Sequence, residues 1–125
     1  SAVIIKENIK HHEEINFSSE IIQATTIRIY IKKLQCNISA VYSSPRHNIM
    51  VEDYIEFLQS LGNRFVAGGD FNSKHTCWGS RLTTTKRRRL LEAVQTLSCN
   101  VLLEGTPTYW PSDRNKRPDV IDMFI

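Results

Sequence analysis

Val66-Ala67-Gly68-Gly69-Asp70-Phe71-Asn72 is the stretch that decides the fold and the chemistry of this chain. An apolar strand delivers two polar side chains, Asp70 and Asn72, at its C-terminal end. Because residues i and i+2 of an extended chain point the same way, we expect both to face one spot. A carboxylate that activates a water, beside an amide that holds a phosphate oxygen, suits phosphodiester hydrolysis. The alternative is a polar turn, since Gly, Asp and Asn all favour turns.

The residues before this stretch predict two strands and a helix. Residues 20–33 alternate isoleucines with Arg28, Tyr30 and Lys32, a period of two that indicates a strand. Residues 36–42 form the next strand, which Ser43-Ser44-Pro45 ends at Tyr42. Residues 50–61 repeat apolar side chains with helical spacing, Asn48 is a plausible cap, and Gly62-Asn63 ends the helix. Residues 2–6 are also strand-like.

The residues after it predict a second helix and further short strands. The helix covers residues 84–98 and draws its cap from Thr83 to Thr85. Strands are expected at residues 101–103, 108–110 and 120–125. Helices therefore fall between strands, which favours a mixed, layered α/β fold. We interpret residues 1–125 as one domain, or as part of one.

The composition fits a soluble globular domain: 41% of the residues are hydrophobic and 23% are charged. No run of apolar residues is long enough for a membrane-spanning helix. Three cysteines without a CxxC pair argue against a disulfide framework or a zinc site and favour a reducing compartment. Because the chain opens in a strand-like run without Met, we expect it to start inside a larger protein.

Positive charge is concentrated in two clusters, Lys86-Arg87-Arg88-Arg89 and Arg114-Asn115-Lys116-Arg117. Such clusters suit polyanion binding. Solvated charge on a helix end and on a loop is the alternative for each.

The order of motifs resembles a known superfamily. Tyr42-Ser43-Ser44-Pro45, Gly69-Asp70-Phe71-Asn72 and residues 120–125 resemble the DNase I-like exonuclease–endonuclease–phosphatase proteins. Residues 69–81, 106–111 and 117–122 are similar to the endonuclease domains of jockey-type non-LTR retrotransposons. The resemblance implies a DNase I-like four-layered α/β sandwich, here expected to lack its N-terminal strands and C-terminal segment.

The resemblance also implies roles for single residues. Asp70 would position or activate the attacking water, and Asn72 would support the phosphate. Tyr42 would contact the scissile phosphate, although an interfacial aromatic residue is the alternative. Asp122 would orient a catalytic histidine, or else only cap a loop. Thr108 would contact the DNA backbone.

Two parts of the family's site are not found among these residues. The family's metal-binding Glu and its catalytic His match no position in this sequence. We therefore assign no metal ligand here, expect Mg²⁺ only for the intact domain, and expect this chain alone to be inactive.

Residues 111–118 lie between two prolines and two predicted strands, as in a projecting hairpin. In the resembled endonucleases such a hairpin enters the DNA minor groove, which would make Arg114, Lys116 and Arg117 DNA-binding residues. A plain connecting loop is the alternative.

The function expected from these features is nicking of target DNA to prime reverse transcription of a retrotransposon. The implied partners are DNA and a reverse transcriptase domain in the same polyprotein, acting in the nucleus, with no membrane. Two alternatives stay open: a remnant that binds nucleic acid without cutting, and another phosphodiesterase or phosphatase of the superfamily.

Overall fold

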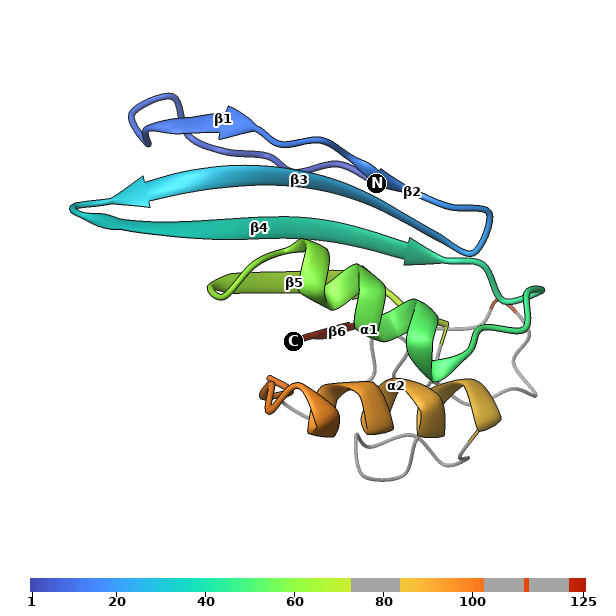
Figure 1. Ribbon diagram of the computed structural model, residues 1–125. Helices are drawn as coiled ribbons and strands as arrows, with labels where there is room; N and C mark the ends of the chain where they lie inside the picture. The colour runs from blue at the N-terminus through green and yellow to red at the C-terminus, as the bar shows by residue number, and fades with distance from the viewer. Residues whose placement is uncertain (73–83, 103–111, 113–121) are drawn as a thin grey trace.

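The computed structural model describes residues 1–72, 84–102, 112 and 122–125; the other residues are drawn as a thin grey trace in Figure 1. At positions 122 and 123 the description covers the backbone only. No helix in these described ranges is long and apolar enough to cross a membrane.

The described residues form one mixed sheet in the order β1-β3-β4-β5-β6, with β2 also paired to β3. β3 and β4 make a long antiparallel hairpin that turns at Lys32, whose φ is 56°. β4 and β5 are parallel, and the chain crosses between them through a helix. The strands are β1 (His11–Glu13), β2 (Phe17–Ser18), β3 (Ile22–Ile31), β4 (Leu34–Ser43), β5 (Phe65–Asp70) and β6 (Asp122–Phe124).

Two helices, α1 (Val51–Ser60) and α2 (Thr85–Thr96), cover one face of this sheet (Figure 1). Their apolar sides meet alternate residues of the strands, since successive strand residues point to opposite faces. The fully buried core is therefore shared by helices and sheet. It contains Tyr54, Phe57 and Leu58 of α1, Leu90, Ala93 and Val94 of α2, and Ile22, Ala24, Val41 and Ala67 of the strands.

Both predicted helices are present, but one predicted cap was wrong. α1 begins after Met50, whose backbone N–H donates to Asp53 Oδ2 at 2.7 Å. Asn48 lies too early to cap it, and its Oδ1 instead accepts a hydrogen bond from Arg89 Nη1 at 2.6 Å. In α2 the predicted threonine cap is confirmed, because Thr84 Oγ1 accepts the Arg87 amide at 3.3 Å.

Residues 2–6 form no strand, contrary to the prediction. The outer edge of β3 is already paired with β1 and β2. The chain start is held by side-chain contacts instead, with Thr25 Oγ1 donating to the Ser1 carbonyl at 3.0 Å. β-branched residues favour strands, but a segment joins a sheet only where a strand edge is still unpaired. Near the C-terminus, the strand predicted at residues 101–103 is described only as a bridge between Leu102 and Phe124.

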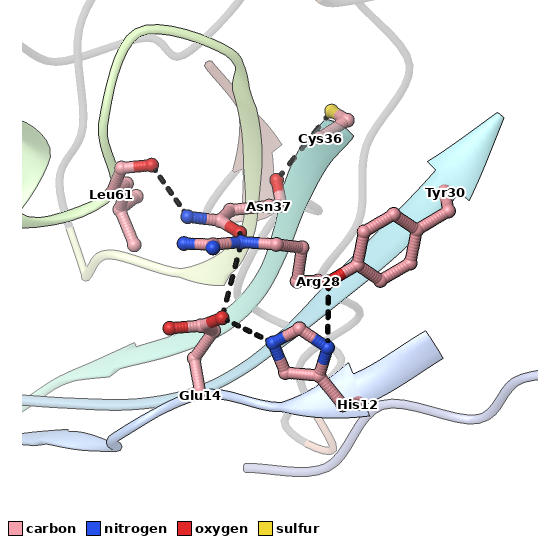
Figure 2. A network of polar contacts seen from close by, with 7 residues as sticks. All are labelled: His12, Glu14, Arg28, Tyr30, Cys36, Asn37 and Leu61. Atoms are coloured by element: carbon pink, nitrogen blue, oxygen red, sulfur yellow. Dashed lines mark hydrogen bonds and ion pairs between the residues drawn. The ribbon is translucent and has the colours of Figure 1, made fainter. Parts of the chain in front are cut away.

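A polar network stabilises the sheet at the end where β4 begins (Figure 2). Arg28 Nε donates to Asn37 Oδ1 and forms an ion pair with Glu14 Oε1, each at 3.1 Å. Asn37 Nδ2 in turn donates to the Leu61 carbonyl at 2.8 Å, and His12 Nε2 lies 2.7 Å from Glu14 Oε1. The network connects the segment after β1 with β3, β4 and the end of α1. It therefore stabilises the sheet at the end away from Tyr42.

Candidate active site

Three of the predicted site residues occupy one row across the sheet. Tyr42, the penultimate residue of β4, is the register partner of Asp70 at the end of β5. Asp70 is in turn the register partner of Asp122, the first residue of β6. Because neighbouring strands lie about 4.8 Å apart, the backbone positions of this Tyr42–Asp70–Asp122 row fall within about 10 Å of each other. Residues far apart in the sequence therefore meet at one end of the sheet.

Tyr42 points away from the helices. Its neighbours Val41 and Ser43 are buried, whereas Tyr42 is 42% exposed. Residues opposite each other in register share a face, so the Asp70 side chain lies on the same side as Tyr42. The phenol and the carboxylate are thus presented together on the face that α1 and α2 leave uncovered.

Asn72 reaches the site by a different route from the one predicted. β5 ends at Asp70, and Asn72 has a φ of 47°, so the expectation of an extended chain was wrong here. Asp70 Oδ1 accepts the Asn72 backbone N–H at 2.7 Å. The Asn72 side chain turns back to β4, where its Nδ2 donates to the Ser43 carbonyl at 2.9 Å. Asn72 therefore orients the Asp70 carboxylate and joins the ends of β4 and β5.

Gly68 and Gly69 permit the close packing behind Asp70. A Cβ on Gly68 would lie 2.3 Å from ring atoms of Phe124 in β6. A Cβ on Gly69 would lie 2.2 Å from the Val41 carbonyl oxygen, and the φ of Gly69 is +141°. No other residue fits position 69 without strain.

The basic cluster at residues 86–89 is not a uniform solvated surface. Arg87 is fully buried, and Arg88 is exposed and donates to Thr85 Oγ1 at 3.3 Å. Arg89 donates to the Ile49 carbonyl at 2.8 Å. Lys86, Arg87 and Arg89 are thus at least partly buried, which is at odds with a uniformly solvated cluster, and polyanion binding by residues 86–89 stays a prediction.

Lys86 is the residue of this cluster that reaches the site. Its Nζ donates to the Ser44 carbonyl at 2.6 Å, just beyond Tyr42. Burial lowers the pKa of its ammonium from 10.5 to about 8, while the nearby Asp70 charge acts in the opposite direction. In the sequence, Lys86 is one of four consecutive basic residues. What distinguishes it is its position in the first turn of α2, which packs beside β4, and only the structure reveals this position.

The remaining predicted residues, Thr108, Arg114, Lys116 and Arg117, lie outside the described part of the chain. Within the described part, no group of three or more His, Cys, Asp or Glu side chains could hold a metal ion. Mg²⁺ prefers one or two carboxylates together with substrate oxygens and waters. Of the two carboxylates of the row, only the Asp70 side chain is described, so the described residues do not complete a magnesium site. A cavity of about 730 Å³ lies at the opposite end of the sheet, lined in part by Cys36, Phe65 and Cys99.

The fold matches that of a solved nuclease domain. The structure of the endonuclease domain of TRAS1, a telomere-specific non-LTR retrotransposon, superimposes with a TM-score of 0.79 over 97% of this chain and 57% of that chain. The sequences are 20% identical, so the likeness concerns the fold. It identifies the α/β architecture as DNase I-like, and the sheet with its helices as part of that architecture.

Curated proteins of mobile elements match the sequence over its length. The chain is 31% identical over 125 residues to the RNA-directed DNA polymerase from mobile element jockey of Drosophila melanogaster. It is 26% identical over 124 residues to the probable RNA-directed DNA polymerase from transposon BS of the same organism. All or nearly all of the chain is covered, but it spans only 14% of the length of either relative.

A family model described as endonuclease-reverse transcriptase matches residues 36–125, a range that contains Tyr42, Asp70, Asn72 and Asp122. This range is most of the chain, and it includes the whole row of site positions. The chain belongs to the endonuclease–reverse transcriptase family, as part of its endonuclease domain.

Proposed function

We propose that the chain is a segment of a metal-dependent endonuclease that nicks target DNA, so that the 3′ hydroxyl primes reverse transcription of a retrotransposon. The observation that carries the proposal is the Tyr42–Asp70–Asp122 row, which collects a phenol position and two acidic positions on three neighbouring strand ends. The names of the curated relatives support a parent polyprotein with a reverse transcriptase domain. The reaction on chromosomal DNA would take place in the nucleus.

In the proposed reaction Asp70 orients a water and accepts its proton as the water attacks the scissile phosphorus. The P–O3′ bond breaks, the new P–O bond leaves a 5′ phosphate, and the departing 3′ oxygen takes a proton from solvent to become the 3′ hydroxyl. The hydrogen bond from the backbone N–H of Asn72 to Asp70 Oδ1 holds the carboxylate in place for this task. The Tyr42 hydroxyl, on the exposed side of β4, donates to a phosphate oxygen, where negative charge grows in the transition state. Asp122 orients the catalytic histidine that the family resemblance implies. Asn72, whose side chain donates to the Ser43 carbonyl, also lies at the end of the sheet where we propose that the phosphate binds.

A divalent metal is proposed for the intact domain only. The described residues do not complete a metal centre, so no step is assigned to one here. The Glu and His that the family resemblance implies match no position among these 125 residues. We therefore propose that the 125 residues do not nick DNA by themselves.

The test is a plasmid-nicking assay on the intact endonuclease domain, made with the flanking sequence of its element. The wild-type domain should convert supercoiled plasmid to open circles with Mg²⁺, and a chelator should stop it. Asp70→Ala should lower the rate about 100-fold or more, because general-base catalysis contributes about 10²–10⁴-fold. Tyr42→Phe removes one phosphate contact and should lower the rate less. Lys33→Met, an exposed substitution in the turn between β3 and β4, serves as the control.

Two results would overturn the proposal. Robust, Asp70-dependent nicking by the 125-residue chain would show that the site needs neither the Glu nor the His. An intact domain that binds DNA but leaves it uncut would instead support a nucleic-acid-binding remnant.

A further inference from the structure

Two successive backbone carbonyls after Tyr42 are held by side chains from elsewhere in the fold. The Ser43 carbonyl accepts Asn72 Nδ2 at 2.9 Å, from the residues that follow β5. The Ser44 carbonyl accepts Lys86 Nζ at 2.6 Å, from the first turn of α2. The end of β4 is thus fastened to two other segments directly beside the residue proposed to contact phosphate.

A lysine is a costly choice for a contact with a backbone carbonyl. Its ammonium loses water on partial burial, which disfavours the charged form. A neutral amide could donate the same hydrogen bond without this cost. The Asp70 carboxylate partly offsets the loss, so the charge of Lys86 is coupled to the central residue of the row.

The row also needs positive charge. Asp70 and Asp122 are register partners on adjacent strands, and a DNA phosphodiester brings a further negative charge to them. Like charges brought together in a partly desolvated site repel strongly. Arg88 and Arg89 are engaged by Thr85, Asn48 and Ile49, whereas Lys86 donates to the Ser44 carbonyl directly after β4.

We propose that Lys86 is a positioning residue of the nicking reaction, holding the segment after Tyr42 against α2 and supplying the positive charge that lets a phosphodiester approach Asp70. This inference rests on the proposed function. Lys86 acts through the Ser44 carbonyl and through Asp70, and the role needs both its hydrogen bond and its charge.

The kinetic experiment compares Lys86→Met, Lys86→Arg and the matched control Lys33→Met in the intact domain. Lys86→Met should lower kcat about 10- to 100-fold, the size of effect expected when reacting groups are displaced by about 1 Å, with a smaller change in KM. Lys86→Arg keeps the charge and should recover most of kcat. Lys33→Met removes the same charge far from the row and should leave kcat and KM within about twofold.

A second measurement does not depend on activity. In the 125-residue chain, NMR of ¹³Cε-labelled lysine should give Lys86 a titration midpoint near pH 8, in keeping with its lowered pKa. Asp70→Asn should lower that midpoint further, because the Asp70 charge favours the protonated amine.

The outcomes separate this inference from the function beneath it. Absence of nicking by the wild-type domain overturns the proposed function and, with it, the role of Lys86. Nicking by the wild type together with an unchanged kcat in Lys86→Met overturns the role of Lys86 alone. A Lys86 midpoint that Asp70→Asn leaves unmoved also overturns it, even where Lys86→Met does not fold.

Discussion

Gly69 sets the spacing between β4 and β5 directly before Asp70. Its φ is +141°, and the Val41 carbonyl oxygen would lie 2.2 Å from any Cβ at this position, which leaves no room for a side chain. Gly69→Ala should therefore lower the free energy of unfolding by about 1–3 kcal/mol, the cost of a strained backbone position. Gly68→Ala meets the ring of Phe124, which is 54% exposed and free to turn outward, so it should cost less. Urea denaturation of both variants gives the comparison, and an equal or reversed order would contradict this account.

Lys86 should give the protein a distinct pH dependence. Its pKa of about 8 in the folded protein is below its ordinary value of 10.5. Between these values the unfolded chain binds a proton that the folded protein has released, so stability rises with pH. Below about pH 8 both states are protonated and the full cost of the buried charge remains. The difference in unfolding free energy between wild type and Lys86→Met should therefore shift in favour of the wild type from pH 8 to 10.5. A difference that stays flat over this range would contradict the burial of Lys86.

Sequence patterns predicted the site residues that lie in strands, but not the direction of the one that lies in a turn. Tyr42 and Asp70 are predicted at strand ends and Asp122 within the strand at residues 120–125, and the register brings those three positions together. Asn72 was assigned to the same region on the assumption of an extended chain. Its φ of 47° gives it another direction, which local sequence does not reveal because Asn tolerates both conformations. Whether these residues have the proposed catalytic roles stays a prediction.

At the level of elements, periodicity was the most reliable signal. The spacing of apolar residues located α1 and α2 to within two residues at either end, because a helix buries one continuous stripe. It could not decide whether residues 2–6 enter the sheet. That outcome depends on which segment pairs with the outer edge of β3, and residues 11–13 and 17–18 do so.

The segment at residues 111–118 remains a prediction as a DNA-reading hairpin. Arg114→Ala with Arg117→Ala in the intact domain should redistribute the nicking sites, since arginine in a narrow minor groove reads DNA shape. Each lost phosphate contact should also lower the slope of log affinity against log salt by about 0.9. Arg88→Ala, an exposed position on α2, should weaken binding without moving the sites. Unchanged sites and slope in the double variant would make the segment a connector.

For the molecule as a whole, the exposed apolar side chains have consequences for solubility. Large apolar side chains are exposed in the described ranges, among them Ile4 at 98%, Ile15 at 96% and Phe124 at 54%. Exposed apolar surface and open strand edges favour association between copies. The 125-residue chain should therefore sediment as a mixture of oligomers, and Ile4→Lys with Ile15→Lys should increase the monomer fraction. A monomeric wild-type chain with a cooperative melt at high temperature would contradict this expectation.

The antiparallel pairing of β5 with β6 ties the row to the order in which the chain is made. Asp70 and Asp122 are register partners, yet about 50 residues separate them in the sequence. At the usual pace of translation, about 5–20 residues per second, β5 emerges several seconds before its neighbour exists. During that interval the β5 edge that later pairs with β6 can pair with another strand of the nascent chain. The nascent chain therefore cannot complete the Tyr42–Asp70–Asp122 row until β6 has been synthesised. The reactive site forms only after most of the segment around it has been made.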